Sequence, residues 1–314
     1  MPDIAVVGEV MLELAPGQTT DSLTLSYAGD TYNTAVTLAR LGVDTAYITR
    51  LGRDRYSQAI LQRLADENID TTGIDLSEAR VPGLYMIHNS PDGEREFAYW
   101  RGQSAARELF HPRLDSSAVR RKLLASPWLY FSGISLAILE DKARADYIDF
   151  LQEYRAAGGR IAFDSNYRPR LWASREEAQH FTKLALTYSN VGLLTMDDEE
   201  ALWGPCTDLA ARYHDYALDE LVFKRGAEDV LVLENHTPEN GNSHAFPVMK
   251  VEPVDTTAAG DNFNAGYLAA RIQGQSIASA VRLACDCAGI IIQHRGGVIP
   301  REVFLEELGE RQRL

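Results

Sequence analysis

The sequence predicts an α/β protein whose mostly parallel sheet carries helices on both faces. Short apolar runs typical of buried strands alternate along the chain with amphipathic helices, which is the pattern of a doubly wound sheet. Apolar residues make up 45% of the 314 residues and charged residues 24%, so the chain can bury a sizeable core. Two strand-rich stretches interrupt the alternation and predict a second, smaller sheet.

The expected elements follow from hydrophobic periodicity. Buried strands are expected at 4–7, 44–51, 128–132, 160–164, 191–194, 220–224 and 230–233. Helical spacing predicts helices at 33–41, 57–67, 142–157, 174–187 and 197–203. From Gly260 onward the chain is expected to be helical, with breaks near Gly274 and Gly296.

The smaller sheet is expected to form a lid. Residues 12–27 and 84–99 alternate as strands do, and Pro91-Asp92-Gly93 is a turn signal between two strand-like arms. We therefore expect one domain over 1–314, with a lid formed by about 12–30 and 80–103 that can close over a site. An exposed lid sheet can also pair with its twin, so a dimer through the lid is expected.

Charge and composition exclude several classes of partner. The formal net charge is -14 with no basic run, which argues against DNA or RNA. No apolar run is long enough to span a membrane, and the chain opens into a strand without a signal-like segment, so we expect a cytoplasmic protein. Cys285 and Cys287 lie two apart in a helical run, where their side chains diverge, so core packing is favoured over a metal site.

One turn carries the strongest chemical signal. Residues 255–261 read as a strand end, a turn of small residues at Ala258, Ala259 and Gly260, and then a helix start at Asp261. Small residues let a ligand approach the backbone, and the unpaired N–H groups of a first helical turn attract anions. A polyphosphate is the expected ligand.

Asp261 allows two interpretations. Taken alone, it is an ordinary helix N-cap. Beside a phosphate cradle, however, its carboxylate can take a proton from an alcohol that attacks the γ-phosphorus, and an N-cap does not require the small residues around it. No P-loop, dinucleotide-binding glycine motif or hydrolase nucleophile elbow occurs in the chain.

These residues resemble a known family. Residues 255–266 are similar to the C-terminal signature of the phosphofructokinase-B or ribokinase superfamily of carbohydrate kinases, with Ala258 in place of the usual first glycine. The added methyl is expected to narrow the approach to phosphate. Residues 29–35 and 38–42 resemble the N-terminal signature, so the likeness spans nearly the whole chain. Within the superfamily, runs such as 164–172 and 224–226 are most similar to the 2-keto-3-deoxygluconate kinases.

The resemblance implies a ribokinase-like fold, ATP with Mg²⁺, and a sugar acid as the acceptor. It implies catalytic roles for Asp261 as base, with Ala258, Ala259 and Gly260 forming the cradle. The implied sugar contacts are Gly29, Asp30, Asn33, Tyr85, Tyr99, Arg101 and Arg168. The implied nucleotide contacts are Asn166, Arg168, Lys224, Gly226, Ala258 and Gly260, with Asp197 and Glu200 reaching Mg²⁺ through water or else forming an ordinary acidic helix start.

The two arginines favour an acid sugar on physical grounds as well. A guanidinium forms a fork that matches a carboxylate. Arg101 ends a lid strand and Arg168 follows a strand end, the edge where open α/β sheets bind ligands. Arg168 can equally serve the phosphates. The alternatives are a kinase for a neutral ketose or pentose, as in fructokinases and ribokinases, or a sugar-binding sensor without catalysis.

Overall fold

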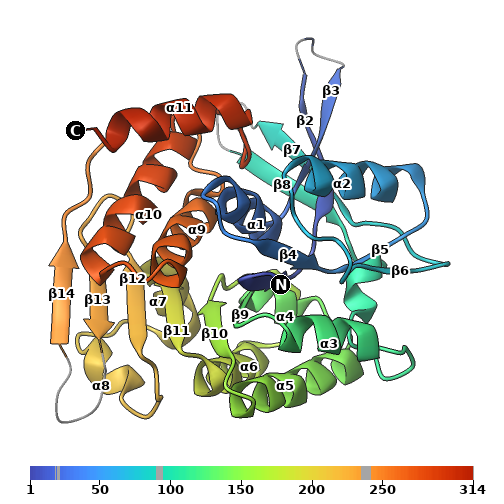
Figure 1. The fold of residues 1–314 in the computed structure, drawn as a ribbon, viewed down its shortest axis with the longest axis horizontal. Coiled ribbons are helices and arrows are strands. Elements are labelled where there is room, and N and C mark those ends of the chain that lie inside the picture. The colour runs from blue at the N-terminus through green and yellow to red at the C-terminus, as the bar shows by residue number, and fades with distance from the viewer. Residues whose placement is uncertain (18, 20–21, 90–94, 235–241, 314) are drawn as a thin grey trace.

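The computed structural model confirms the predicted α/β fold (Figure 1). It describes residues 1–17, 19, 22–89, 95–234 and 242–313. The main sheet has the strand order β14-β13-β12-β11-β10-β9-β1-β4. Neighbouring strands from β12 to β4 are parallel, whereas β13 is antiparallel to both of its neighbours, β12 and β14. Its strands are β1 (Ile4–Val7), β4 (Thr45–Ile48), β9 (Trp128–Ser132), β10 (Arg160–Asp164), β11 (Val191–Thr195), β12 (Glu220–Lys224), β13 (Val230–Glu234) and β14 (Asn242–Phe246).

Helices cover both faces of this sheet because its central strands are apolar on both sides. Ala5 and Val7 of β1 face one core, and Ile4 and Val6 face the other. The first core includes side chains of α3 (Ser117–Leu124), α4 (Gly133–Ala137), α5 (Asp141–Ala156), α6 (Arg175–Tyr188), α7 (Met196–Trp203) and α8 (Leu209–Tyr213). The second includes α1 (Asp30–Arg40), α2 (Arg55–Asp66), α9 (Ala259–Ile272) and α10 (Ile277–Ile291), and α11 (Arg301–Arg311) packs against α10.

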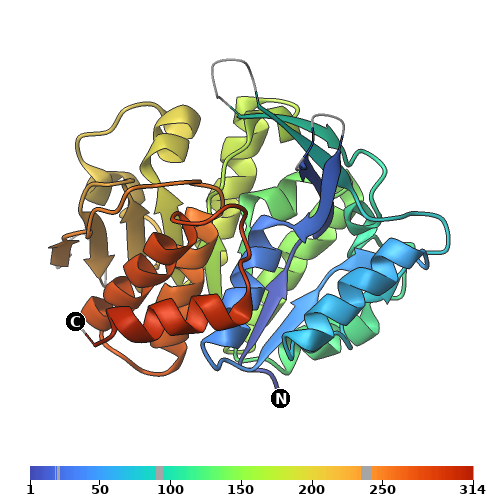
Figure 2. The same cartoon turned by 90° about the horizontal axis from the view of Figure 1, so that it is seen from above.

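The lid is a four-stranded sheet that projects from the main domain (Figure 2). Its order is β3-β2-β7-β8, with β2 (Met11–Pro16), β3 (Leu23–Ala28), β7 (Leu84–Asn89) and β8 (Arg95–Trp100). β2 and β7 are parallel, and the other two pairings are antiparallel. The predicted turn at Pro91-Asp92-Gly93 lies outside the described residues.

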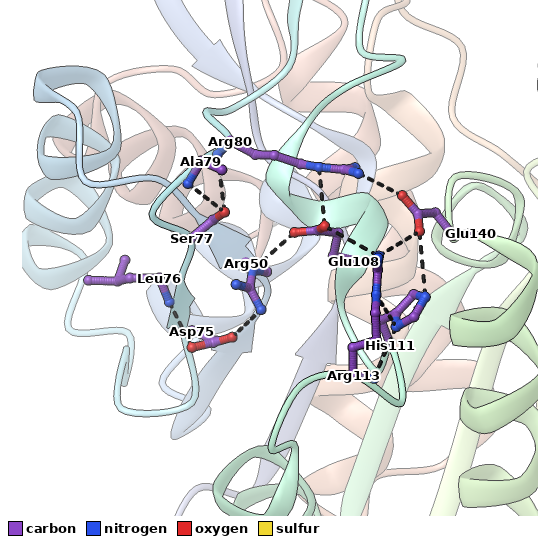
Figure 3. Close-up of polar contacts among 10 residues, drawn as sticks. All are labelled: Arg50, Asp75, Leu76, Ser77, Ala79, Arg80, Glu108, His111, Arg113 and Glu140. Carbon is purple, nitrogen blue, oxygen red and sulfur yellow. Dashed lines mark hydrogen bonds and ion pairs between the residues drawn. The ribbon is translucent and has the colours of Figure 1, made fainter.

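A polar network ties the β7–β8 arm of the lid to the main domain (Figure 3). The chain enters this arm after β5 (Arg50–Leu51) and β6 (Asp75–Leu76), and leaves it through the 3₁₀ turn η1 (Ala105–Glu108). Glu108 on the outgoing segment faces Arg80 on the incoming segment at 3.3 Å, and Arg50 at 3.7 Å. Arg80 also pairs with Glu140, just before α5, at 2.8 Å. Both ends of the arm are therefore held to the core at one place.

Some elements of the structure were not predicted from the sequence, for reasons that are local to each. The expected strand at 44–51 is divided into β4 and β5, because Thr49 leaves the ladder between them. Edge strand β14 lacks an apolar run, and most of its side chains are exposed. α3, α4, α8 and the 3₁₀ turn η2 (Pro169–Leu171) are short and were also not expected.

Two further expectations concern a metal site at the cysteines and the presence of membrane-spanning helices. Cys287 is buried in α10, and burial raises the pKa of Cys285 to about 11, so these thiols resist ionisation. Within the described residues, no group of three or more histidine, cysteine or acidic side chains is arranged to hold a metal ion. No helix in the described part of the chain is long and apolar enough to cross a membrane.

Candidate active site

A large cavity opens where the parallel strands end and the lid begins. Its volume is about 1110 Å³, which is ample for a nucleotide and a sugar. Every residue to which the sequence assigned a site role lines this cavity except Glu200. These residues are Gly29, Asp30, Asn33, Tyr85, Tyr99, Arg101, Asn166, Arg168, Asp197, Lys224, Gly226, Ala258, Ala259, Gly260 and Asp261.

The start of α9, which the sequence predicts to be an anion cradle, lies at the cavity. Ala258 precedes the helix in the left-handed conformation, with φ 60°, a conformation that costs a non-glycine residue about 1–2 kcal/mol. Among the described residues, no acceptor is found for the backbone N–H of Gly260 or of Asp261. A methyl on Gly297 would lie only 2.9 Å from the Ala258 methyl, so the latter packs toward Gly297.

Asp261 lies at the floor of the cavity beside this cradle. Asn33 in α1 donates to Oδ2 of Asp261 at 2.9 Å, and the Thr34 hydroxyl donates to its carbonyl at 3.1 Å. Burial and the nearby Asp30 carboxylate raise the pKa of Asp261 well above its usual range. A carboxylate that holds a proton this strongly is suited to act as a general base near neutral pH.

Asp30 is the first residue of α1 and has donors on two sides. Its Oδ2 accepts from the Ser132 hydroxyl and, at 3.0 Å, from Asn166 Nδ2. Burial raises the pKa of Asp30 as well. Asn166 has φ 29°, which is uncommon for a non-glycine residue and is typical of functional sites held by their surroundings.

The lid contributes the opposite wall. Tyr85 and Tyr99 lie side by side with ring centroids 5.7 Å apart, and the Tyr85 hydroxyl donates to the buried Glu13 of β2. Arg101, just after β8, forms a buried ion pair with Glu9 from the segment after β1. A methyl on Gly83 would lie about 3.1–3.2 Å from Arg101 Cβ and Glu9 Oε1, so the backbone of Gly83 packs closely against this pair.

The acidic segment at β11 and α7 differs from the expectation. Asp198 lines the cavity, accepts from Tyr167 N at 3.2 Å and faces Arg168 at 3.4 Å, whereas Glu200 is exposed and does not line it. Asp197, the other acidic residue expected near the phosphates, does line the cavity.

Other important residues were also missed. Glu9, Glu13, Ser132 and Asp164 contact predicted site residues but were assigned no role from the sequence. Asp164 begins the run 164–172 that carries part of the family resemblance, and Glu9, Ser132 and Asp164 stand at or just after the carboxyl ends of predicted parallel strands, where ligands bind.

Comparison with known proteins places this geometry in a family. The model of the pfkB family carbohydrate kinases matches residues 1–303. The chain belongs to that family. It is 43% identical over 309 residues to the 2-dehydro-3-deoxygluconokinase of Escherichia coli K12, which covers 96% of this chain and 98% of the relative. The enzyme of the same name from Dickeya dadantii is 39% identical over 309 residues, with the same coverage.

A solved structure of the family shares the fold. The fructokinase of Xylella fastidiosa with bound ATP superimposes with a TM-score of 0.83 at 19% identity, covering 99% of this chain and all of that one. The fold of this pfkB kinase and the motifs missing from its sequence therefore both argue against a P-loop or dinucleotide-binding protein. The lid, which interrupts the α/β alternation, lies across the cavity from the anion cradle.

The cavity lining includes carboxylates of the kind that bind Mg²⁺. Mg²⁺ keeps several waters and is held through one or two carboxylates together with substrate phosphates. Asp197 and Asp198 line the cavity near β11, but no described cluster supplies a complete set of protein ligands. Asp197 and Asp198 are therefore the residues that would hold an ion that enters with a nucleotide.

Proposed function

We propose that this pfkB kinase transfers the γ-phosphoryl group of ATP to the 6-hydroxyl of 2-keto-3-deoxy-D-gluconate, also called 2-dehydro-3-deoxygluconate. The observation that carries the proposal is the 38–43% identity, over 96% of the chain, to kinases named for that sugar acid. The cavity supports it chemically, because its lining includes the candidate cradle and base as well as Arg101 and Arg168.

In this proposal Asp261 accepts the proton of the attacking hydroxyl. Its raised pKa makes it a base strong enough for the task, and the bond from Asn33 holds the carboxylate in place. The N–H groups of Gly260 and Asp261 and the ammonium of Lys224 stabilise the negative charge of the transferring group. Bound Mg²⁺ supplies further neutralisation of the phosphate oxygens.

The sugar acid would be oriented by the arginines. Arg101 is buried and already pairs with Glu9, so it offers its remaining N–H donors rather than an uncompensated charge. Arg168 is half exposed and faces Asp198 at 3.4 Å, so it can swing toward a carboxylate or a phosphate. A carboxylate held at this end directs the far hydroxyl of the sugar toward Asp261.

A phosphorylation screen tests the substrate. We expect ADP release with 2-keto-3-deoxygluconate to exceed that with fructose or ribose in kcat/KM by at least about 10²-fold, the scale of a charge-assisted contact. Arg101→Ala should lower kcat/KM for the acid sugar by about 10–100-fold and for fructose by much less. Arg53→Ala is the matched control, since Arg53 pairs with Glu78 on the exposed surface.

The alternatives are distinguished in the same assay. Equal losses of kcat/KM on acid and neutral sugars in Arg101→Ala and Arg168→Ala would indicate a neutral-ketose kinase. No turnover with any sugar, alongside sugar binding by calorimetry, would indicate a sensor.

The outer face of the lid suggests self-association. By strand register, Leu25 and Trp100 lie on the face opposite Tyr85 and Tyr99, and they are 38% and 58% exposed. Exposed apolar side chains on a small sheet favour pairing with an equal surface. We propose a dimer through this face, which sedimentation of wild type and Leu25→Asp would test; a monomeric wild type would contradict it.

A further inference from the structure

Lys224 is held at the wall of the cavity by side chains from two other elements. It ends β12, and its Nζ donates to Asp164 Oδ1 at 3.1 Å and to Asn264 Oδ1 at 3.0 Å. The side chains of Lys224 and Asp164 are only 9% and 3% exposed. A methyl on Gly260 would lie 3.6 Å from Nζ, so the ammonium borders the anion cradle.

The two partners of Lys224 are themselves fixed. Asp164 ends β10, and its Oδ2 accepts from Asn264 Nδ2 at 2.9 Å. The same Nδ2 lies 3.0 Å from the hydroxyl of Tyr130 in β9. Both oxygens of the Asp164 carboxylate are thus engaged, and the arrangement joins β9, β10, β12 and α9 at the carboxyl ends of the strands.

The donor count leaves Lys224 with one N–H for a ligand. An ammonium has three N–H donors, and two of them are used by Asp164 and Asn264 within the described part of the chain. A buried ion pair stabilises a fold no better than well-packed apolar side chains in many cases. Its place beside a cradle for phosphate therefore favours a role in the reaction.

We propose that Asp164 and Asn264 are positioning residues that fix the Lys224 ammonium so that its third N–H meets the transferring phosphoryl group. The proposal rests on the proposed function only in requiring phosphoryl transfer at this cradle. Lysine is a point charge on a flexible stem. Fixed in advance, it needs no rearrangement when charge develops on the phosphoryl oxygens.

The same pair influences Asp261 electrostatically. Around Asp261, the carboxylates of Asp30 and Asp164 raise its pKa, whereas the Asn33 hydrogen bond and Lys224 lower it. The phenols of Tyr85 and Tyr130 also lie near Asp261, and both are neutral at neutral pH because burial raises their pKa values. Removing the Asp164 charge should lower the pKa of Asp261, and removing the Lys224 charge should raise it.

A double-mutant cycle tests the proposal. Asp164→Asn and Lys224→Met are each expected to lower kcat by about 10²-fold, the scale of one lost oxyanion donor. The double variant should be no more than about threefold slower than Lys224→Met, because Asp164 acts through the lysine. The acid limb of the pH profile of kcat/KM should move to lower pH in Asp164→Asn and to higher pH in Lys224→Met.

Two more variants guard against a purely structural effect. Asn264→Ala should lower kcat when Lys224 is present but should not lower it further in the Lys224→Met enzyme. This variant replaces Asp164→Asn in the cycle if Asp164→Asn does not fold. Tyr154→Phe removes a buried hydrogen bond to the Ser126 carbonyl, at 2.6 Å, without touching this network, and its kcat should stay within about twofold of wild type.

Other outcomes would overturn the proposal. Losses of kcat that multiply in the double variant, or normal kcat with a lowered melting temperature in Asp164→Asn and Asn264→Ala, would assign these residues to the fold alone. The cycle is measured on whichever ketose the wild type phosphorylates fastest. A preference for a neutral sugar would therefore contradict the substrate assignment and leave this test intact.

Discussion

The ends of the cavity that we propose for the phosphate and for the sugar, called here the phosphate end and the sugar end, are built on different parts of the molecule. At the phosphate end, Asp261, Lys224 and Asn264 stand on a helix start and a strand end of the main domain, and their polar partners are main-domain residues. At the sugar end, Tyr85 and Tyr99 stand on the lid strands β7 and β8. The phosphate end depends on the α/β core alone, whereas the sugar end depends on how the lid meets the core.

The difference lies in where each charge finds its counter-charge. Lys224 meets Asp164 within the core of the main domain. Arg101, by contrast, meets Glu9 across the junction of lid and core, and the base of the same arm is held by Glu108 and Arg80 (Figure 3). We therefore expect changes at the core to alter kcat and changes at the arm to alter sugar affinity.

Of the variants that test this difference, Gly297→Ala is expected to have the largest effect. The new methyl would lie 2.8 Å from Asn33 Nδ2 and 2.9 Å from the Ala258 methyl, so it would push the amide that holds Asp261. We expect kcat to fall roughly tenfold, since small displacements of a catalytic group are costly. The matched control is Gly309→Ala in α11, which meets no atom within 4 Å. An unchanged kcat would show that Asn33 does not fix Asp261.

A smaller effect is expected at the arm. Glu108→Gln weakens the contacts with Arg80 at 3.3 Å and Arg50 at 3.7 Å. We expect KM for the sugar to rise about two- to fivefold, the effect of roughly 1 kcal/mol, with KM for ATP unchanged. Glu78→Gln, which alters an exposed pair with Arg53, serves as control. Equal rises in both KM values would mean that the lid does not act on the sugar end alone.

The smallest effect concerns Ala258. Because its φ is 60°, glycine there should relieve strain and raise the free energy of unfolding by about 0.5–1 kcal/mol. Thermal unfolding of Ala258→Gly should show a melting temperature about 1–3 °C higher. Ala259→Gly, inside the first turn of α9, should instead lower it. A lower melting temperature in both variants would mean that the Ala258 conformation carries no strain.

Much of the fold and of the candidate site could be predicted from the sequence. Apolar strands buried on both faces have an unmistakable composition, and the turn at 258–261 combines small residues with a helix start. The lid was predictable because its strands alternate without helices between them. Edge strand β14 was not, because most of its side chains face water.

The supporting residues of the site were harder to predict. Glu9 and Asp164 act through tertiary contacts with Arg101 and Lys224, residues 92 and 60 positions away, and single acidic residues show no periodicity. Likewise, Asp198 lines the cavity but stands in the acidic run 197–200, where nothing in the sequence distinguishes it from its neighbours.

The central claim is that Asp261 deprotonates the acceptor hydroxyl, and Asp261→Asn tests it most directly. We predict that kcat falls by at least about 10²-fold while ATP and sugar still bind by calorimetry. In the wild type, kcat/KM should decline with falling pH well above pH ~4, the region of an ordinary carboxyl, because the pKa of Asp261 is raised.

The free energy of unfolding should change with pH in the direction opposite to kcat/KM. Since the folded-state pKa is raised, the ionised carboxylate disfavours the fold as pH rises through that pKa, so Asp261→Asn should be at least as stable as wild type at alkaline pH. A stable Asp261→Asn enzyme with nearly normal kcat and an unchanged acid limb would contradict the account. A folded enzyme that binds both substrates but has lost turnover is the result that the account predicts.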